Sequence, residues 1–250
     1  MKVRIKTLKI LKNVLLIIPL ILITTTVSYG AENYPHQSKG VFIVDNFEDK
    51  NLTRQPKWWA FGELDVYINE NDRKQLNGLE LHAMHIKGRR TQPKLVGGVG
   101  AFIGLDVRPY NAIKMAIKGY GKHSGILMIE LYDDDSNDWE LTIHPNDPSQ
   151  IIHDDKFIYS MKIDWEGWKV IIIPLRKFKD NNPMFGDNSW NPYHTDASGG
   201  LLQMQLLLFA THKKKKPNLA IDSIKFFNTK NIKKNENKNK VDFNLDDDFY

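Results

Sequence analysis

Residues Gly125–His144, with the sequence GILMIELYDDDSNDWELTIH, predict two β-strands joined by a turn. In both arms apolar side chains occupy every second position. Because successive side chains of a strand point to opposite faces, each arm is expected to turn one face toward a core. The Asp133–Asn137 segment between the arms has the Asp, Asn and Ser composition of a hairpin turn. The core-facing residues are Leu127, Ile129 and Leu131 in the first arm, and Trp139, Leu141 and Ile143 in the second.

A turn centred near Asp135 sets the register of this hairpin. Leu131 then pairs with Trp139 on the core face, and Glu130 lies opposite Glu140 on the other face. Like charges directly opposite each other destabilise a sheet. The pattern therefore indicates either a shifted register or a face on which carboxylates have a use.

The first 30 residues have the features of a secretory signal peptide. Five basic residues precede the apolar run Val14–Ile23, and Ser28-Tyr29-Gly30 places small residues where a signal peptidase cleaves. The apolar run is shorter than the ~20 residues of a membrane-spanning helix. We expect residues 1–30 to be removed, the chain to be secreted or periplasmic, and no stable membrane span to remain. Retention of the segment as an N-terminal anchor is the alternative.

The composition argues against several classes of protein. The formal charge of +5 comes from the basic residues of the signal segment, and their removal leaves 30 basic and 30 acidic residues. A neutral chain lacks the positive surface of a nucleic-acid binder, so we expect no nucleic-acid partner. The absence of cysteine excludes disulfides, thiolate metal sites and a cysteine nucleophile.

The remainder of the chain predicts one β-sandwich domain, residues 31–228, and a disordered charged tail, residues 229–250. Short β-rich runs separated by turn signals favour an all-β fold of two antiparallel sheets, whereas the tail is too polar to bury a core. Trp58 and Trp59 are adjacent, so at most one of them joins the core. Further strands are expected at Val41–Val44, Leu64–Ile68, Leu79–Ile86, Gly100–Leu105, Ala112–Lys118, Phe157–Ile163, Trp168–Pro174, Leu201–Ala210 and Asn218–Phe227.

Four segments resemble the galactose-binding-like jelly-roll superfamily, which includes carbohydrate-binding modules and complex I intermediate-associated proteins. They are VDNFEDKN (Val44–Asn51), RPYNAIKMAIKGYG (Arg108–Gly121), WEGWKVIIIPLRKF (Trp165–Phe178) and LAIDSIKFF (Leu219–Phe227). The resemblance spans nearly the whole domain and implies a jelly-roll sandwich. It implies function less directly, because one fold serves many functions.

The resemblance makes the non-core face of the Gly125–His144 strands a candidate carbohydrate site. Such sites combine aromatic platforms with planar polar groups that hydrogen-bond to hydroxyls, and Tyr132 is expected to stack on a sugar ring. In the resembled fold the Leu201–Phe209 strand lies beside these strands, and its glutamines extend the same surface. The predicted binding residues are Glu130, Tyr132, Glu140, Thr142, His144, Gln203 and Gln205, with Arg108 and Trp59 at the rim. An ordinary solvated sheet face is the alternative.

The resemblance also implies a structural calcium ion that joins the first and last strands. The matching positions are Glu48 and Asp222, and carboxylate oxygens suit calcium. The acidic segment Asp133–Asp138 starts like an EF-hand. It lacks the required glycine at the sixth position, Asp138, and the glutamate at the twelfth, His144, so it is interpreted as a turn.

We therefore expect an exported protein that binds a polysaccharide or oligosaccharide without catalysis. A second hypothesis is a protein–protein assembly module of the cell envelope, which needs a protein partner. A third is a small glycoside hydrolase or lyase, which needs Glu130 and Glu140 to lie close together across a cleft.

Overall fold

The computed structural model describes residues 37–38, 40–70, 82–91 and 94–230 of the 250-residue chain. The expected signal peptide, nearly all of the expected tail and residues 79–81 of an expected strand lie outside these ranges. The strands are β1 (Gln37–Ser38), β2 (Val41–Asp45), β3 (Trp58–Gly62), β4 (Leu64–Glu70), β5 (His82–Gly88), β6 (Leu95–Leu105), β7 (Ala112–Tyr120), β8 (Gly125–Asp133), β9 (Thr142–His144), β10 (Asp147–Ile152), β11 (Asp155–Ile163), β12 (Glu166–Pro174), β13 (Lys179–Asp180), β14 (Leu201–Phe209) and β15 (Asn218–Phe227).

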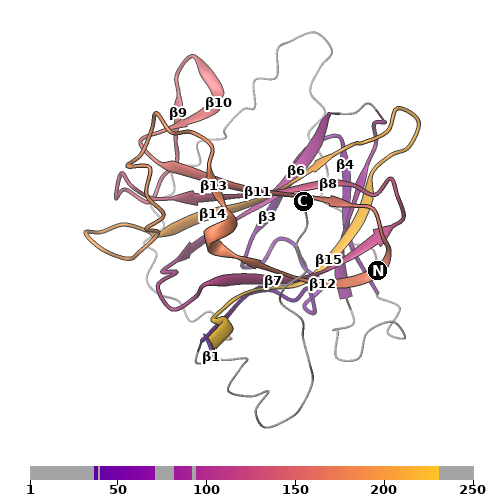
Figure 1. The fold of residues 1–250 in the computed structure, drawn as a ribbon, viewed down its shortest axis with the longest axis horizontal. Coiled ribbons are helices and arrows are strands. Elements are labelled where there is room, and N and C mark those ends of the chain that lie inside the picture. The colour runs from indigo at the N-terminus through magenta and orange to yellow at the C-terminus, as the bar shows by residue number, and fades with distance from the viewer. Residues whose placement is uncertain (1–36, 39, 71–81, 92–93, 231–250) are drawn as a thin grey trace.

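Two antiparallel sheets form the body of the molecule, one above the other in Figure 1. Sheet B has the strand order β13-β11-β8-β14-β6-β3. In sheet A, β15 is central. It pairs with β7 along one side, and with β5 and β2 along the other; β12, β4 and β1 complete the sheet. Among the described residues no helix is long and apolar enough to cross a membrane.

The strand pairing is that of a jelly roll. The pair β6–β14 in sheet B is matched by β5–β15 in sheet A, and the pair β8–β11 is matched by β7–β12. The consecutive strands β5 and β6, β7 and β8, β11 and β12, and β14 and β15 therefore lie in opposite sheets, as in a two-stranded ribbon wrapped around a core. The predicted all-β, two-sheet antiparallel sandwich is confirmed.

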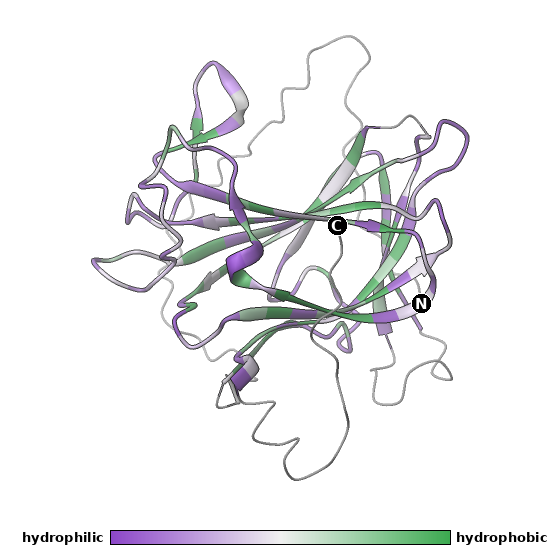
Figure 2. Ribbon diagram, viewed as in Figure 1, coloured by the Kyte–Doolittle hydropathy of each residue, from purple (hydrophilic) through white to green (hydrophobic). Residues whose placement is uncertain are grey.

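The core lies between the sheets and follows the predicted alternation. Leu127, Ile129 and Leu131 of β8 are fully buried, as is Phe226 of β15 in the facing sheet. Each such side chain contributes roughly 1.5–3 kcal/mol by leaving water. Trp58 is 4% exposed and belongs to this core, which confirms that only one of the two adjacent tryptophans does. Figure 2 shows hydrophobic residues along the strands and hydrophilic ones in most of the connecting loops.

The predicted hairpin within Gly125–His144 is wrong. Both edges of β8 pair with strands distant in sequence, so Leu131 lies opposite Phe157 of β11 and Met204 of β14 instead of Trp139. The second arm is mostly loop, and its end, β9, pairs with β10 in a separate two-stranded sheet. In Figure 1 this small hairpin projects beyond the end of the sandwich.

Carboxylates of the acidic segment explain why the chain leaves the sheet after β8. Asp134 Oδ2 accepts hydrogen bonds from the backbone N–H groups of Trp139 (3.2 Å) and Gly199 (2.6 Å). Asp134 Oδ1 also accepts the backbone N–H of Asp138 at 3.3 Å. These bonds curl the segment around Asp134 and join it to the loop before β14, because Asp side chains readily replace backbone acceptors in turns.

Candidate ligand-binding face

The outer face of sheet B, which points away from the core, brings several predicted residues together. Trp59 lies opposite Gly100, Gly100 opposite Gln205, and Gln205 opposite Glu130, so these residues form one row across β3, β6, β14 and β8. Three strand spacings separate its ends, which places Trp59 about 14 Å from Glu130 along the row. This surface is called the outer face below.

A second row lies beside the first. Phe102 of β6 is opposite Gln203 of β14, which is opposite Tyr132 of β8. The sequence prediction that the glutamine-bearing strand neighbours Glu130 and Tyr132 is therefore confirmed. Gln203 and Gln205 are half-buried, so their amides lie among neighbouring side chains and still reach the surface.

Aromatic rings lie against glycines along β6. A methyl group added to Gly100 would come within 2.5 Å of Trp59 Cζ2, and one added to Gly98 within 2.8 Å of Phe61 Cζ. Glycine in a strand permits such close approach of another group. A residue with a side chain at either position would lift the ring from the sheet, so β6 is built to seat these rings.

A third ring continues the line along β6. Trp139 lies over Gly104, where an added methyl group would be 3.1 Å from Cζ3. Its indole N–H donates to the carbonyl of Ala197 at 2.7 Å, which fixes the ring from the loop side. The prediction that Trp139 faces the core is therefore wrong: it is a half-buried residue of the outer face. We call Phe61, Trp59, Phe102 and Trp139 the aromatic row.

Glu130 and Tyr132 form a buried polar pair beside the aromatic row. The Tyr132 hydroxyl donates to Glu130 Oε2 at 2.6 Å, and the two residues are 4% and 8% exposed, respectively. Burial raises the pKa of Tyr132 well above its ordinary value, and the neighbouring Glu130 charge adds to this. With so little of its ring exposed, Tyr132 offers a sugar almost no stacking surface in this structure, and its visible role is to orient Glu130.

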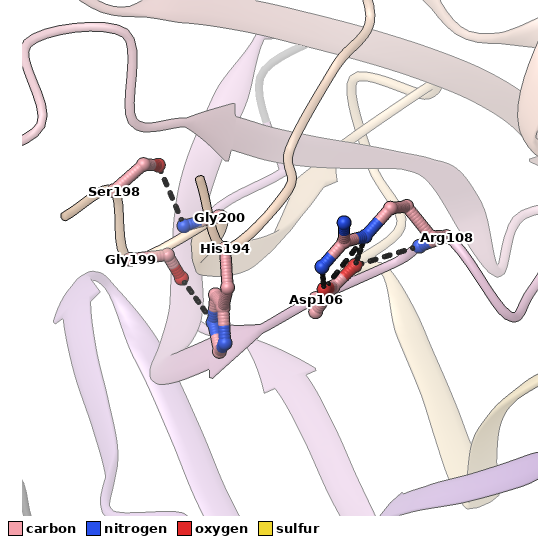
Figure 3. A network of polar contacts seen from close by, with 6 residues as sticks. All are labelled: Asp106, Arg108, His194, Ser198, Gly199 and Gly200. Carbon is pink, nitrogen blue, oxygen red and sulfur yellow. Dashed lines mark hydrogen bonds and ion pairs between the residues drawn. The ribbon is translucent and has the colours of Figure 1, made fainter. Parts of the chain in front are cut away.

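Arg108 lies beyond the end of β6, where it was predicted to form the rim. Its Nε donates to both carboxylate oxygens of Asp106, at 2.9 and 2.8 Å (Figure 3). Burial tends to raise the pKa of Asp106, but the hydrogen bonds from Arg108 outweigh it and the pKa is lowered. The guanidinium also lies 5.8 Å from the centre of the Tyr193 ring.

His194 belongs to the same rim. Its Nε2 donates to the carbonyl of Gly199 at 3.0 Å (Figure 3), and its ring centre is 5.7 Å from that of Trp139. Arg108 and His194 therefore place two nitrogen-bearing side chains beside the end of the aromatic row.

Three predicted binding residues are not on the outer face. Glu140 is exposed in the loop after β8, and Thr142 and His144 lie in β9, which pairs with no strand of sheet B in the described structure. Glu130 lies opposite Ile158 and Gln205, not opposite Glu140. The predicted Glu130–Glu140 pair is therefore wrong, and the hydrolase hypothesis loses the geometry on which it rested.

The two predicted calcium ligands have different surroundings. Glu48 Oε1 accepts the backbone N–H of His82 at 2.7 Å, and Oε2 lies 3.3 Å from His82 Nδ1. Asp222 is fully buried in β15, opposite Ala116. Carboxylate oxygens suit calcium, but both oxygens of Glu48 already contact His82. A calcium ion at this position stays a prediction.

Sequence reasoning missed Phe61, Phe102 and Trp139. The signal was the glycine pattern of LVGGVGAFIGL, residues 95–105, in which positions 98, 100 and 104 fall on one face of a strand. A run of glycines on one face of an otherwise apolar strand indicates that other groups approach the backbone there. The rings that fill these places come from β3 and from the loop after β8, and no local pattern identifies them.

Comparison with known proteins places the chain near carbohydrate-binding modules among the solved structures. A family 11 module from Clostridium thermocellum in complex with a β-1,3-1,4-mixed-linked tetrasaccharide has 17% identity and a TM-score of 0.46, over 77% of this chain and 98% of the module. The module TmCBM61 in complex with β-1,4-galactotriose has 10% identity and a TM-score of 0.42, over 76% and 99% of the two chains. A family 22 module of Clostridium thermocellum has 12% identity and a TM-score of 0.40, over 77% and 96%.

All three of these solved structures are carbohydrate-binding modules. At such identities and TM-scores they carry no argument about what this chain binds. No family model matches the sequence, and no curated protein matches it.

Proposed function

We propose that the chain binds a glycan, without catalysis, on the outer face of sheet B. The observation that supports this most strongly is the aromatic row seated on the β6 glycines beside Gln203, Gln205 and Glu130. A sugar ring has an apolar face of C–H groups and an edge of hydroxyls. Sites for such ligands need aromatic surface for the face and a few fixed polar groups for the edge.

Each group has a separate role in this proposal. Trp59 stacks on the apolar face of a sugar ring, because it is the predicted rim residue whose ring lies over Gly100 of β6. Gln205 donates and accepts hydrogen bonds one strand further, and Glu130 accepts them on the next strand, where the Tyr132 hydroxyl holds its carboxylate. A chain of sugars lying across the strands would meet these groups in turn.

Arg108 and His194 would contact hydroxyls at the rim. Export by the N-terminal segment, to the cell exterior or the periplasm, agrees with a polysaccharide ligand and is part of the proposal.

A glycan array tests the proposal. The full-length chain is applied with and without calcium, beside Trp59→Ala and the control Trp165→Ala. Trp165 is also half-buried, but its indole N–H reaches the carbonyl of Ile117 in sheet A, at 3.4 Å. We expect a related set of glycans to bind the wild type and the control but not Trp59→Ala. A silent array from folded protein would refute the proposal and direct the search to a protein partner.

A further inference from the structure

Three acidic side chains from separate parts of the sequence meet at one end of sheet B. Asp135 follows β8, Asp155 begins β11, and Asp187 lies in the loop before β14. One carboxylate oxygen from each lies within 4.8 Å of those from the other two. Asp155 of β11 lies opposite Asp133 of β8, so Asp135, which follows Asp133 by two residues, comes close to Asp155. We call these three residues the acidic triad.

Backbone hydrogen bonds hold the triad in place. The N–H of Asp155 donates to Asp135 Oδ2 at 2.9 Å. The N–H of Ser189 donates to Asp155 Oδ2 at 3.0 Å and to Asp187 Oδ1 at 2.8 Å. The Asn191 amide donates to Asp187 Oδ2 at 3.1 Å. The three carboxylates are therefore oriented by the surrounding chain and are not loose surface groups.

One oxygen of the triad is buried and has no hydrogen-bond partner. The Asp155 side chain is 0% exposed, and its Oδ1 accepts no hydrogen bond from any described residue. None of the ion pairs between described residues includes a member of the triad. A buried carboxylate oxygen without a donor or a positive partner is costly, so its position calls for a ligand.

The space next to this oxygen is kept open by a glycine. A methyl group added to Gly186 would lie 2.1 Å from Asp155 Oδ1 and 2.6 Å from Asp135 Oδ2, so both oxygens lie beside this glycine. A surface hollow of about 400 Å³ adjoins it, and its lining includes Asp135, Gly186 and Asp187. An ion could therefore reach Asp135 and Asp187 from solvent, beside the buried Asp155.

We propose that Asp135, Asp155 and Asp187 bind a calcium ion at this end of sheet B. Three carboxylates are hard oxygen donors and select calcium, magnesium or manganese over softer metals. Calcium accepts six to eight oxygens in irregular geometry, which loop carbonyls and water can complete, whereas magnesium demands a near-ideal octahedron. Burial, with nearby like charges, raises the pKa of Asp135 to about 7 and of Asp155 to about 6. A bound cation would stabilise the ionised carboxylates.

This site is distinct from the Glu48 and Asp222 positions, and its bound ion has a structural consequence. The ion joins the end of β8, the start of β11 and the loop that leads into β14. β8 and β14 carry Glu130 and Gln203 of the outer face, so calcium would fix the end of the surface proposed to bind glycans. The metal site itself does not depend on that proposal.

Calorimetric titration and thermal unfolding of the full-length chain test the site. The measurements use EDTA, calcium chloride and magnesium chloride, with Asp155→Asn, Asp187→Asn, Glu48→Gln and the control Asp196→Asn, which replaces an exposed acid outside the triad. Calcium at about 100 times its Kd should raise the melting temperature of the wild type by about 5–10 °C. Asp187→Asn should weaken binding by at least about tenfold, because each carboxylate supplies both charge and a ligand.

The sign of one effect separates a metal site from a structural role. In EDTA, Asp155→Asn should melt at the same or a higher temperature than the wild type, because the amide removes a charge and can donate to Asp135. In calcium the wild type should be the more stable. The inference is overturned if calcium does not affect the folded wild type. It is also overturned if calcium stabilises Asp155→Asn and Asp187→Asn as much as the wild type. This holds whether or not Glu48→Gln loses its response to calcium.

Discussion

Replacement of Trp59 by alanine removes an aromatic ring near the β3 edge of the proposed binding surface. The indole lies over Gly100, on the side of sheet B away from the core, and is half-buried. Loss of a core tryptophan costs about 3–5 kcal/mol. Because one side of this ring faces outward, we expect a smaller loss of unfolding free energy, about 1–2 kcal/mol, which leaves the protein folded. A stacking tryptophan at a binding site is worth at least about 2 kcal/mol, so affinity should fall about thirtyfold or more.

The assay combines calorimetric titration of the glycan that binds best with urea unfolding of each variant. Trp165→Ala removes a comparably buried indole near sheet A and should lower stability while leaving affinity unchanged. If Trp59→Ala is folded and binds the glycan as tightly as the wild type, stacking on this ring is refuted.

Three further predictions concern residues around this face and the core. Gly100→Val should displace the Trp59 ring, since the new Cβ would lie 2.5 Å from Cζ2; we expect a cost of about 1–3 kcal/mol in urea unfolding and loss of glycan binding in the same titration. Tyr132→Phe removes the donor to Glu130 and should lower the unfolding free energy by about 1.5–3 kcal/mol, whereas an unchanged value would show that this hydrogen bond contributes nothing. Burial raises the pKa of Asp45 from 3.8 to about 6, so the folded protein holds this proton more tightly than the unfolded chain. Proton binding by Asp45 therefore contributes about 3 kcal/mol to the free energy of unfolding below pH 4, and this contribution is lost as the pH rises through about 6. Urea unfolding in EDTA at a series of pH values should show this loss in the wild type and not in Asp45→Asn.

The sequence predicted the fold and part of the outer face because side chains alternate between the two faces of a strand, and this alternation can be seen in the sequence. Alternation in Leu127–Leu131 identified the core side of β8, and the adjacency of Trp58 and Trp59 required that they point to opposite sides. The apolar strand containing Gln203 and Gln205 lies beside β8, as the resembled fold implied. These features depend on local pattern or on strand order, which a sequence displays.

The partner of β8 could not be read from the same pattern. Alternation shows that Trp139–Ile143 is suited to a strand, but not that β11 and β14 already occupy both edges of β8. The hydrogen bond that the N–H of Gly199 donates to Asp134 also joins residues that are distant in sequence. The predicted placement of Glu140, Thr142 and His144 failed for this reason.

The acidic triad illustrates the same limit for metal sites. The segment Asp133–Asp138 was tested against an EF-hand, in which one loop supplies the ligands in order. In the structure Asp135 meets Asp155 and Asp187, which are 20 and 52 residues further along the chain. A site assembled from three segments has no spacing rule, so only the fold reveals it.

The indole N–H signals in a nuclear magnetic resonance titration test the central proposal most directly. The chain has six tryptophans, which report on different surfaces. As a glycan that binds the wild type is added, the Trp59 signal should shift most, while Trp165 and Trp168, which contact sheet A, should not move. A shift of Trp165 or Trp168 with no change at Trp59 would contradict glycan binding on the outer face of sheet B.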